Sequence, residues 1–351
     1  MNKNTILFFI FFGLIRSTDV WGQDVHFSQF YNTPTLLNPA LTGLFKYDYR
    51  VTGIYRSQWK QANATYSTAA ISGDMNFTIN PVTGDKLGVG IFAFNDQIGD
   101  GIIKNNTFIL SLAYHKILDK QKRNRLSFGL QGGYVQKSID YSGLTFGNQI
   151  VDYQIDQSAL SGENGINRIS YMNLNAGVAW MYKLSPKTDL QTGVSVFNVV
   201  SPKESFADQA TFIGDPNSLK LRPLWYGALE FLWTEKISLH PSVMYVYQSQ
   251  AQEINAGTAV GYAIKNVGGQ RMMIMLGGWW RVRDAAIFMA GFRYKNYNVA
   301  FTYDMTTSDL RQVRNTPTGR GAIGAYEITL TYMGLFKRAL PNNHTIPCGI
   351  F

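Results

Sequence analysis

The sequence has almost no cysteine, few charges and no long hydrophobic run. Its single cysteine, Cys348, excludes an intramolecular disulfide and a cysteine-rich structural metal site. A membrane-spanning helix needs about twenty apolar residues, and the strongest apolar run, Ile6–Ile15, is too short for that. Charged residues make up 16% of the chain, whereas soluble domains are about a quarter charged. These shortages argue against a disulfide scaffold, a helical membrane protein and an ordinary soluble domain.

The apolar run near the N-terminus has the flanks of a secretory signal peptide. Lys3 precedes it, and the small-residue ending Val20-Trp21-Gly22 follows it. We therefore predict that residues 1–22 are a signal peptide and that the mature protein is exported. An exported chain with a net charge of +9 does not meet nucleic acid. We interpret the positive charge as solvated turns, with contact to anionic outer-membrane lipid as the alternative.

Aromatic residues and glycine are abundant where charge is scarce. Aromatics reach 14% of the chain, and there are 33 glycines. Export, many aromatics and the absence of long apolar runs together predict an all-β fold, a transmembrane antiparallel β-barrel in the bacterial outer membrane. Aromatic residues near strand ends would suit the girdles at the two membrane interfaces; they are Tyr55, Trp59, Trp180, Trp225, Trp233, Trp279 and Trp280.

Apolar and polar residues alternate with a period of two along many segments, as they do when successive side chains face lipid and lumen. Segment 171–182 is one example, with Met172, Leu174 and Trp180 set against Asn173 and Asn175. Such segments number about fourteen, and single-chain bacterial barrels have an even number of strands. The expected strands are 47–59, 64–79, 86–97, 105–117, 125–139, 168–183, 188–199, 221–233, 236–249, 253–265, 270–281, 284–294, 297–306 and 321–335.

The connections between these strands are sorted by length. The long ones, Asp140–Asn167, Val200–Lys220 and Thr307–Arg320, all fall on the same side of the expected barrel. Outer-membrane barrels have short periplasmic turns and long outer loops, whereas a soluble β-sandwich, the alternative fold, has no reason to sort them. We therefore expect the long loops outside the cell and both termini in the periplasm.

Several charged or titratable residues occupy expected lumen positions. Because an isolated buried charge is costly, we expect them to pair in a narrow lumen. Such a set is either a structural salt-bridge network or a polar surface for an inserted partner segment, and the sequence favours neither. The expected lumen residues are Asp74, Glu230, His240, Lys265, Arg293, Asp304 and Glu327.

Motifs that carry covalent chemistry are weak. Gly88, Gly90 and Ala93 form a G-x-G-x-x-A pattern inside one alternating strand, where a dinucleotide site would need a helix to follow. Glycines in such strands more often relieve crowding in the lumen. His240 shares a face with Ser238 and Ser242, which leaves a membrane hydrolase as a poor third hypothesis. We predict no catalytic, cofactor-binding or metal-binding residue.

The segment that follows the signal peptide, residues 23–45, shows no alternation. It contains two prolines and several amides, and its apolar residues Tyr31, Leu36, Leu37 and Leu41 need a hydrophobic shelter. Large barrels hold plugs in their lumen. We therefore expect this segment to plug the barrel or to form a strap across its periplasmic floor.

The same segment carries a long aperiodic motif. His26–Gly43 reads HFSQFYNTPTLLNPALTG, and YRSQW follows at Tyr55–Trp59. This strongly resembles the PorP/SprF family of type IX secretion outer-membrane proteins of the Bacteroidota. The ending Pro347–Phe351 departs from the family's Cys-Pro-basic-aromatic tail, because it keeps the cysteine and the aromatic only. The motif positions are His26, Phe27, Ser28, Gln29, Tyr31, Leu37, Asn38, Pro39, Ala40 and Gly43.

The resemblance implies a binding role without an enzymatic activity or a cofactor. Family members either pair with one large secreted adhesin that carries a type B C-terminal signal domain, as in gliding motility, or associate with periplasmic ring or peptidoglycan-linked lipoproteins. The alternative function is a passive or substrate-specific porin. The expected organisation is a signal peptide at 1–22, an N-terminal segment at 23–45, a barrel at 46–337 and a periplasmic tail at 338–351.

Overall fold

A computed structural model gives the architecture of the protein. It describes residues 27–59, 65–99, 102–141, 147–151, 154–155, 167–206, 218–249, 251–265, 271–308 and 324–336. The expected signal peptide, His26, the C-terminal tail with Cys348 and most of the three long connections lie outside the described residues. Within the described ranges, no helix is long and apolar enough to cross a membrane.

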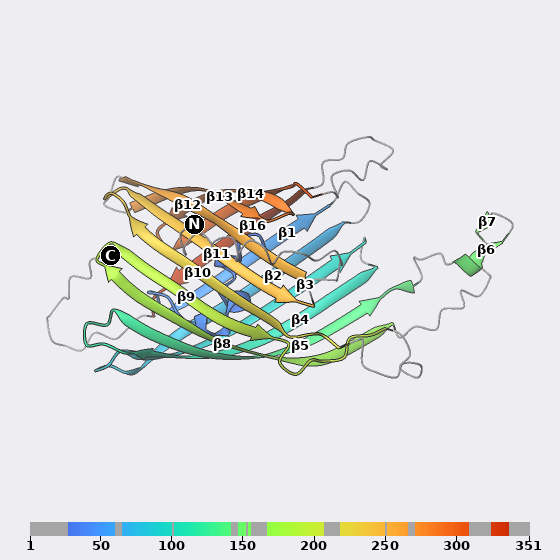
Figure 1. Ribbon diagram of the computed structural model, residues 1–351, viewed down its shortest axis with the longest axis horizontal. Coiled ribbons are helices and arrows are strands. Elements are labelled where there is room, and N and C mark those ends of the chain that lie inside the picture. Colours follow the sequence, from blue (N-terminus) through green and yellow to red (C-terminus); the bar gives the residue numbers. More distant parts are fainter. Residues whose placement is uncertain are drawn as a thin grey trace, which may run out of the picture.

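Fourteen strands form one closed antiparallel barrel, as the alternation predicts (Figure 1). The first and last strands close it, with Tyr49 opposite Gly334 and Gln58 opposite Ala325. The strands are β1 (Tyr49–Gln58), β2 (Tyr66–Asn80), β3 (Asp85–Ile98), β4 (Ile103–Ile117), β5 (Asn124–Ile139), β8 (Arg168–Ser185), β9 (Thr188–Phe197), β10 (Arg222–Leu232), β11 (Ile237–Gln248), β12 (Ala251–Lys265), β13 (Arg271–Arg281), β14 (Ala285–Tyr294), β15 (Tyr297–Thr306) and β16 (Gly324–Gly334). The predicted all-β barrel fold is confirmed.

Along each strand, side chains that face outward and are mostly apolar alternate with side chains that face the lumen, many of which are small or polar. In β4, Phe108 and Leu110 are 45% and 55% exposed on the outer face, while Ser111, Ala113 and His115 are buried on the inner face. An outer wall of bare apolar side chains is stable only against lipid, because water would penalise so large an apolar surface. The burial pattern therefore places the described barrel in a membrane.

The two ends of the barrel differ in their connections. At one end, here called the turn end, β2 joins β3, β8 joins β9 and β14 joins β15 through short turns. The opposite end, here called the loop end, carries the three long connections. One of these contains a separate two-stranded sheet, β6 (Ile150–Val151) and β7 (Gln154–Ile155), which extends away from the barrel in Figure 1. Tyr49 and Gly334 mark the turn end, and Gln58 and Gly324 mark the loop end.

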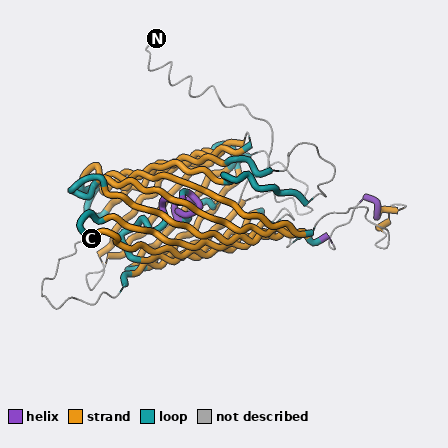
Figure 2. Tube along the Cα trace, turned by 90° about the horizontal axis from the view of Figure 1, so that it is seen from below, coloured by secondary structure: helices purple, strands orange, loops and turns teal. Residues whose placement is uncertain are grey.

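The N-terminal segment lies inside the barrel as a chain of three short helices. They are η1 (Phe30–Asn32), α2 (Pro34–Leu37) and η2 (Pro39–Leu41), and Figure 2 shows them within the wall of strands. Pro34 and Pro39 stand at the first helical position, where proline has the required φ and needs no hydrogen-bond partner. The Asn38 side chain caps η2 by accepting a bond from the Ala40 N–H. Of the two expected arrangements, plug or strap, the described residues form the plug.

Candidate functional site

The plug begins at a buried ionic cluster near the loop end. The Glu327 carboxylate accepts the backbone N–H of Ser28 at 2.9 Å and that of Gln29 at 3.1 Å. The Ser28 hydroxyl donates to Asp304 at 2.5 Å and also contacts the Arg56 guanidinium. Glu327 is fully buried, so these backbone donors and the arginine take the place of water around its charge.

Two arginines balance the two acids of this cluster. Arg56 lies 3.3 Å from Asp304 and 3.4 Å from Glu327, and Arg281 lies 3.2 Å from Asp304. Ser28, Arg56, Arg281, Asp304 and Glu327 are called the loop-end cluster below. Four strands of the wall and the first plug residues meet at these charges, so removing any one of them leaves its buried partners with less compensation.

Polar atoms without partners surround the start of the plug. Asn255 and Thr302 are fully buried, yet neither amide atom of Asn255 nor the hydroxyl of Thr302 has a hydrogen-bond partner within the described residues. The same holds for one Asp304 oxygen, the Gln29 amide nitrogen and the Tyr31 hydroxyl. Buried polar atoms of this kind are normally satisfied by ordered water. The loop-end half of the plug is therefore held in polar surroundings that suit water.

The middle of the plug fits against glycines. A Cβ on Gly129 would overlap the backbone of Pro39 and Ala40, and one on Gly177 would overlap the Asn38 amide. The inward glycines in contact with the plug belong to four strands and are called the glycine slot; they are Gly88, Gly90, Gly129, Gly177 and Gly193. The interpretation that strand glycines relieve crowding in the lumen therefore holds for Gly88 and Gly90, which contact Thr42.

Asn38 fixes the plug in this slot. Its side-chain N–H groups donate to the carbonyls of Val178 and Val194, each at 3.0 Å, while its side-chain oxygen accepts from Ala40 at 2.9 Å. The side chain is fully buried, and glycine at 177 and 193 gives it room. A residue of this size with one acceptor and two donors satisfies all three partners at once.

The plug leaves the slot near the turn end through a second set of polar contacts. His115 lies 2.9 Å from the Thr42 carbonyl and 2.8 Å from the Ser127 hydroxyl, so its Nε2 carries the hydrogen that Thr42 accepts. The Gly43 N–H donates to Asp74 at 2.8 Å, and Arg50 donates twice to the same carboxylate. Gly43 has a φ of +72°, a left-handed conformation that favours glycine.

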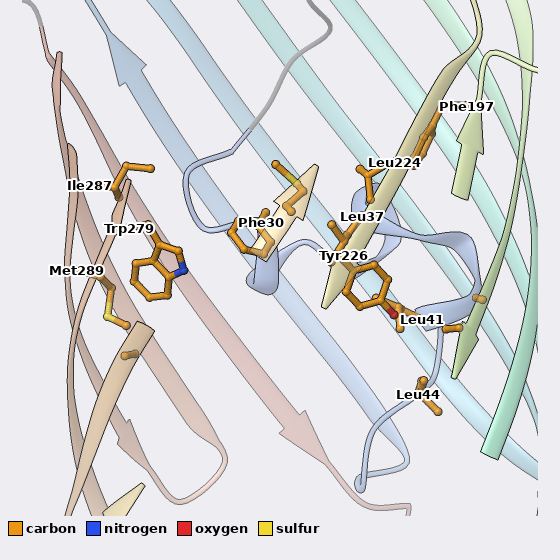
Figure 3. Packing of buried hydrophobic residues seen from close by; sticks show 14 residues of the cluster. Phe30, Leu37, Leu41, Leu44, Phe197, Leu224, Tyr226, Trp279, Ile287 and Met289 are labelled. Carbon is orange, nitrogen blue, oxygen red and sulfur yellow. The ribbon is translucent and has the colours of Figure 1, made fainter. Parts of the chain in front are cut away.

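Apolar residues of the plug pack against the inner wall (Figure 3). In this view Phe30 and Leu37 lie below Phe197, with Leu41 and then Leu44 further down. The Tyr31 ring stacks on Trp279, with centroids 4.9 Å apart. Trp279 is buried and faces the lumen, so the expectation that it belongs to an interfacial girdle is wrong, whereas its neighbour Trp280 is 48% exposed on the outer face. The wall residues of the cluster are Ala179, Phe197, Leu224, Tyr226, Met244, Ala259, Trp279, Ile287 and Met289.

The seven expected lumen residues do not form one network. Asp304 and Glu327 share the loop-end cluster, and Asp74 pairs with Arg50 at 2.6 Å near the turn end. Glu230 is exposed, His240 lies beside Ser238, and the Arg293 Nε has no hydrogen-bond partner among the described residues. Lys265 ends β12, and its side chain lies outside the described part of the structure. The sequence pattern missed the cationic partners Arg50, Arg56 and Arg281, although all three stand at inward positions of their strands.

The serine–histidine pair behind the hydrolase hypothesis exists but is incomplete. The Ser238 hydroxyl lies 2.9 Å from His240 Nε2. A hydrolytic triad also needs an acid hydrogen-bonded to the other ring nitrogen, and the described residues supply no such hydrogen bond. No group of three or more histidine, cysteine or acidic side chains that could hold a metal ion occurs among the described residues either.

Comparison with known proteins identifies the family. The profile of the type IX secretion system membrane protein PorP/SprF matches residues 20–332. The chain belongs to the PorP/SprF family. Its motif is the plug: Ser28 and Gln29 bind the loop-end cluster, and Asn38, Pro39 and Ala40 fill the glycine slot. No curated protein matches the sequence.

Solved structures that resemble this barrel include a transporter and a channel. The toluene transporter TbuX of Ralstonia pickettii has a TM-score of 0.51 and 11% identity, over 87% of this chain and 94% of that one. A deletion mutant of the monoaromatic hydrocarbon channel TodX has a TM-score of 0.50 and 9% identity, over 87% and 94%. At such low identity the likeness concerns the fold alone, and it agrees with an outer-membrane barrel of a type IX secretion family.

Proposed function

We propose that this PorP/SprF protein is a non-enzymatic outer-membrane component that pairs with a large secreted adhesin and anchors it at the cell surface. The partner would carry a type B C-terminal signal domain. The observation that supports this best is a lumen filled by the chain's own plug, since a filled lumen suits a rigid anchor better than a conduit. The loop end, with its three long connections, then provides the docking rim on the outside of the cell.

Deletion of the gene in the native bacterium tests this proposal. We expect the adhesin to remain inside the cell or to be shed into the medium, and the full chain to restore it at the surface. A second strain carries the barrel with residues 207–217, in the connection between β9 and β10, replaced by a glycine–serine linker. This barrel should reach the outer membrane and fail to retain the adhesin. Normal surface retention in the deletion strain contradicts the proposal.

The partner decides between the two roles that the family allows. Affinity purification of the tagged barrel from outer membrane should recover a large surface protein if the barrel is an anchor. Recovery of periplasmic ring lipoproteins or peptidoglycan-linked lipoproteins instead would place the barrel in the secretion machine itself.

A porin is the second candidate, because solved barrels of similar fold are hydrocarbon channels. Conductance of the purified protein in a planar bilayer separates the two functions. A plugged anchor stays silent without its partner, whereas a porin conducts steadily.

A further inference from the structure

The outer face of the barrel ends in two different ways at the loop end. On β13 and β15 the outward positions stay apolar up to the last one, which is Trp280 or Met305. The strands β3, β4 and β5 run for 14, 15 and 16 residues, against 11 and 10 in β13 and β15. On these longer strands two polar outward positions follow the apolar ones, so this side of the wall continues beyond the apolar belt.

The register across the long strands sorts their outward residues into three rows. Ala93, Phe108 and Tyr134 lie beside one another in an apolar row. The next row towards the loop end consists of amides, and the row beyond it holds the cations Lys104 and Arg168. The amide row is Asn95, Asn106 and Gln136, and the cation row is Gln97, Lys104, Ser138 and Arg168.

A hollow of about 510 Å³ opens on the outer face where the apolar row meets the amide row. The small side chains of Ala69 and Ala93 leave this space, and the exposed rings of Phe108 and Tyr134 line it from the next two strands. Aromatic rings on the outer face of a barrel mark the level at which acyl chains meet headgroups. The hollow therefore lies at the depth of acyl chains.

The amide row forms a polar rim between the hollow and the cations. Asn95 donates to Asn106 at 2.7 Å and accepts from Gln97 at 2.9 Å, so the amides hold one another in place. Side-chain amides offer donors and acceptors at one level. Such a rim suits the hydroxyl and carbonyl groups of a lipid headgroup.

The cations beyond the rim differ from the outward lysine at the other end of β4. There, Lys116 pairs with Asp85 at 2.8 Å. Lys104 and Arg168 are exposed, and neither forms an ion pair with another residue in the described ranges. Only Ser138 of β5 stands between them in the register, so their strands are about 10 Å apart and one anionic group can contact both side chains.

We propose that this side of the barrel binds a phosphorylated glycolipid of the outer leaflet, of the lipid A class. An acyl chain occupies the hollow, the sugar lies on the amide row, and a phosphate lies between Lys104 and Arg168. A protein docked above the membrane can meet the cations but does not reach an apolar hollow at acyl depth. The choice of leaflet rests on the proposed function, in which the loop end faces the outside of the cell.

Lipid titration of the purified full-length barrel in detergent tests this site, with native mass spectrometry as the readout. The probes are lipid A, dephosphorylated lipid A and phosphatidylglycerol, which is an anionic lipid without the sugar. We expect the barrel to retain lipid A with a dissociation constant lower by about tenfold or more than for either other probe. Equal retention of lipid A and its dephosphorylated form, or tighter binding of phosphatidylglycerol, overturns the proposal.

A charge variant tests the headgroup contacts. Lys104→Gln combined with Arg168→Gln should weaken lipid A binding by roughly 30-fold, because each cation near a membrane surface adds a similar share of the attraction to an anionic lipid. Lys120→Gln, at an exposed lysine in the turn between β4 and β5, is the matched control and should leave binding unchanged. Unchanged binding in the double variant overturns the proposal.

A volume variant tests the hollow. Ala93→Phe fills it from the outer face, away from the plug, and should weaken lipid A binding by about tenfold through loss of acyl contact. Ala290→Phe, at an exposed outward alanine of β14, is the control. Heat-modifiable migration shows that each barrel is folded. If Ala93→Phe binds lipid A as tightly as the parent protein, no acyl chain occupies the hollow and the proposal fails.

This proposal and the proposed function fail on different measurements. Normal surface retention of the adhesin in the deletion strain contradicts the anchor, and it does not change lipid binding by the purified barrel. Equal lipid A binding by the parent protein and the charge variant contradicts the lipid site, and it does not change retention of the adhesin.

Discussion

The two halves of the plug are held in different ways. Phe27–Thr33 is bound by charges and by hydrogen bonds to the loop-end cluster, among polar atoms that have no partner in the described part of the structure. Pro34–Gly43 is bound mainly by shape, because its backbone lies against strand positions that have no side chain. Hydrogen bonds that Asn38, Thr42 and Gly43 make with the wall add to this fit. Charge contacts strengthen in a dry lumen and weaken when water or a partner supplies other ligands. Close packing of the plug against the strand glycines is weakened by a larger side chain at these positions and depends little on water.

This difference assigns the two halves separate roles in the proposed anchor. The slot half keeps the lumen filled, and the loop-end half ties the plug to the charged residues of the wall near the loop end. Variants in each half can break or sharpen this comparison, and they are given below from the largest expected effect to the smallest.

Loss of the Glu327 carboxylate should have the largest effect. Glu327→Ala leaves the N–H groups of Ser28 and Gln29 buried without an acceptor and removes one of the two acids that Arg56 contacts, which costs about 3–5 kcal/mol in the free energy of unfolding. Urea titration of the protein in lipid vesicles measures it, with heat-modifiable migration as the readout. Glu230→Ala, at an exposed acid, is the matched control and should change little. Equal midpoints for the two variants would contradict a loop-end cluster that holds the plug.

Filling the glycine slot should come next. Gly129→Leu places a side chain against the backbone of Pro39 and Ala40, and overpacking of this kind costs about 1–3 kcal/mol or more. Gly53→Leu is the control, because a Cβ there meets nothing within 4 Å. We also expect Gly129→Leu to conduct in a planar bilayer, since the plug can no longer seat. If the Gly129→Leu protein does not conduct and is as stable as the parent protein, the glycine slot does not hold the plug.

Asn38→Ala tests the hydrogen bonds of the slot without adding volume. It removes both bonds from Asn38 to the carbonyls of Val178 and Val194 and the side-chain acceptor of the Ala40 N–H, and such losses cost about 1–3 kcal/mol. Asn106→Ala, at an exposed asparagine of β4, serves as the control. If hydrogen exchange of the Ala40 and Leu41 amides is as slow in the Asn38 variant as in the parent protein, the side chain does not fix the plug.

Removal of the Thr302 hydroxyl should have the smallest effect. Thr302 is fully buried and its hydroxyl has no partner among the described residues, so Thr302→Val removes a polar group without breaking a bond to any of them. We expect the free energy of unfolding, measured by urea titration, to stay within about 1 kcal/mol of that of the parent protein or to rise. Ser195→Ala, which removes the bond from that hydroxyl to the Leu37 carbonyl in the slot half, should lower it. If Thr302→Val lowers the urea midpoint as much as Ser195→Ala does, the two halves of the plug are not held in different ways.

The barrel could be predicted from sequence because alternation is a local property. Met172, Leu174 and Trp180 face outward, and Asn175 and Ala179 face inward, as their order along the chain requires. The strand boundaries differ from the prediction by only a few residues. Pairing between strands is not local, so the partners of Asp304 and Glu327 could not be read from one sequence.

The sequence could predict which segment forms the plug, but it could not predict how that segment fits against the barrel wall. The apolar residues of 23–45 required shelter, and the family motif marked the same stretch. The matching signal in the wall was the glycine at inward positions of β3, β5, β8 and β9. A single glycine in a strand indicates only a position without a side chain. These glycines form one slot because the strand register places Gly177 beside Gly129, and the register is not visible in one sequence. The prediction for Trp279 was wrong because it rested on residue type and position near a strand end, which Trp279 shares with Trp280. The two side chains are successive along β13 and therefore point to opposite faces of the wall.

Single-channel conductance tests most directly whether the plug fills the lumen. The mature protein and a form that lacks residues 24–45 are reconstituted separately in planar bilayers, and heat-modifiable migration confirms that both barrels are folded. The parent protein should hold a closed baseline, and the shortened form should pass current in steady steps. Steady current of the same size from both proteins would contradict a lumen closed by Phe27–Gly43.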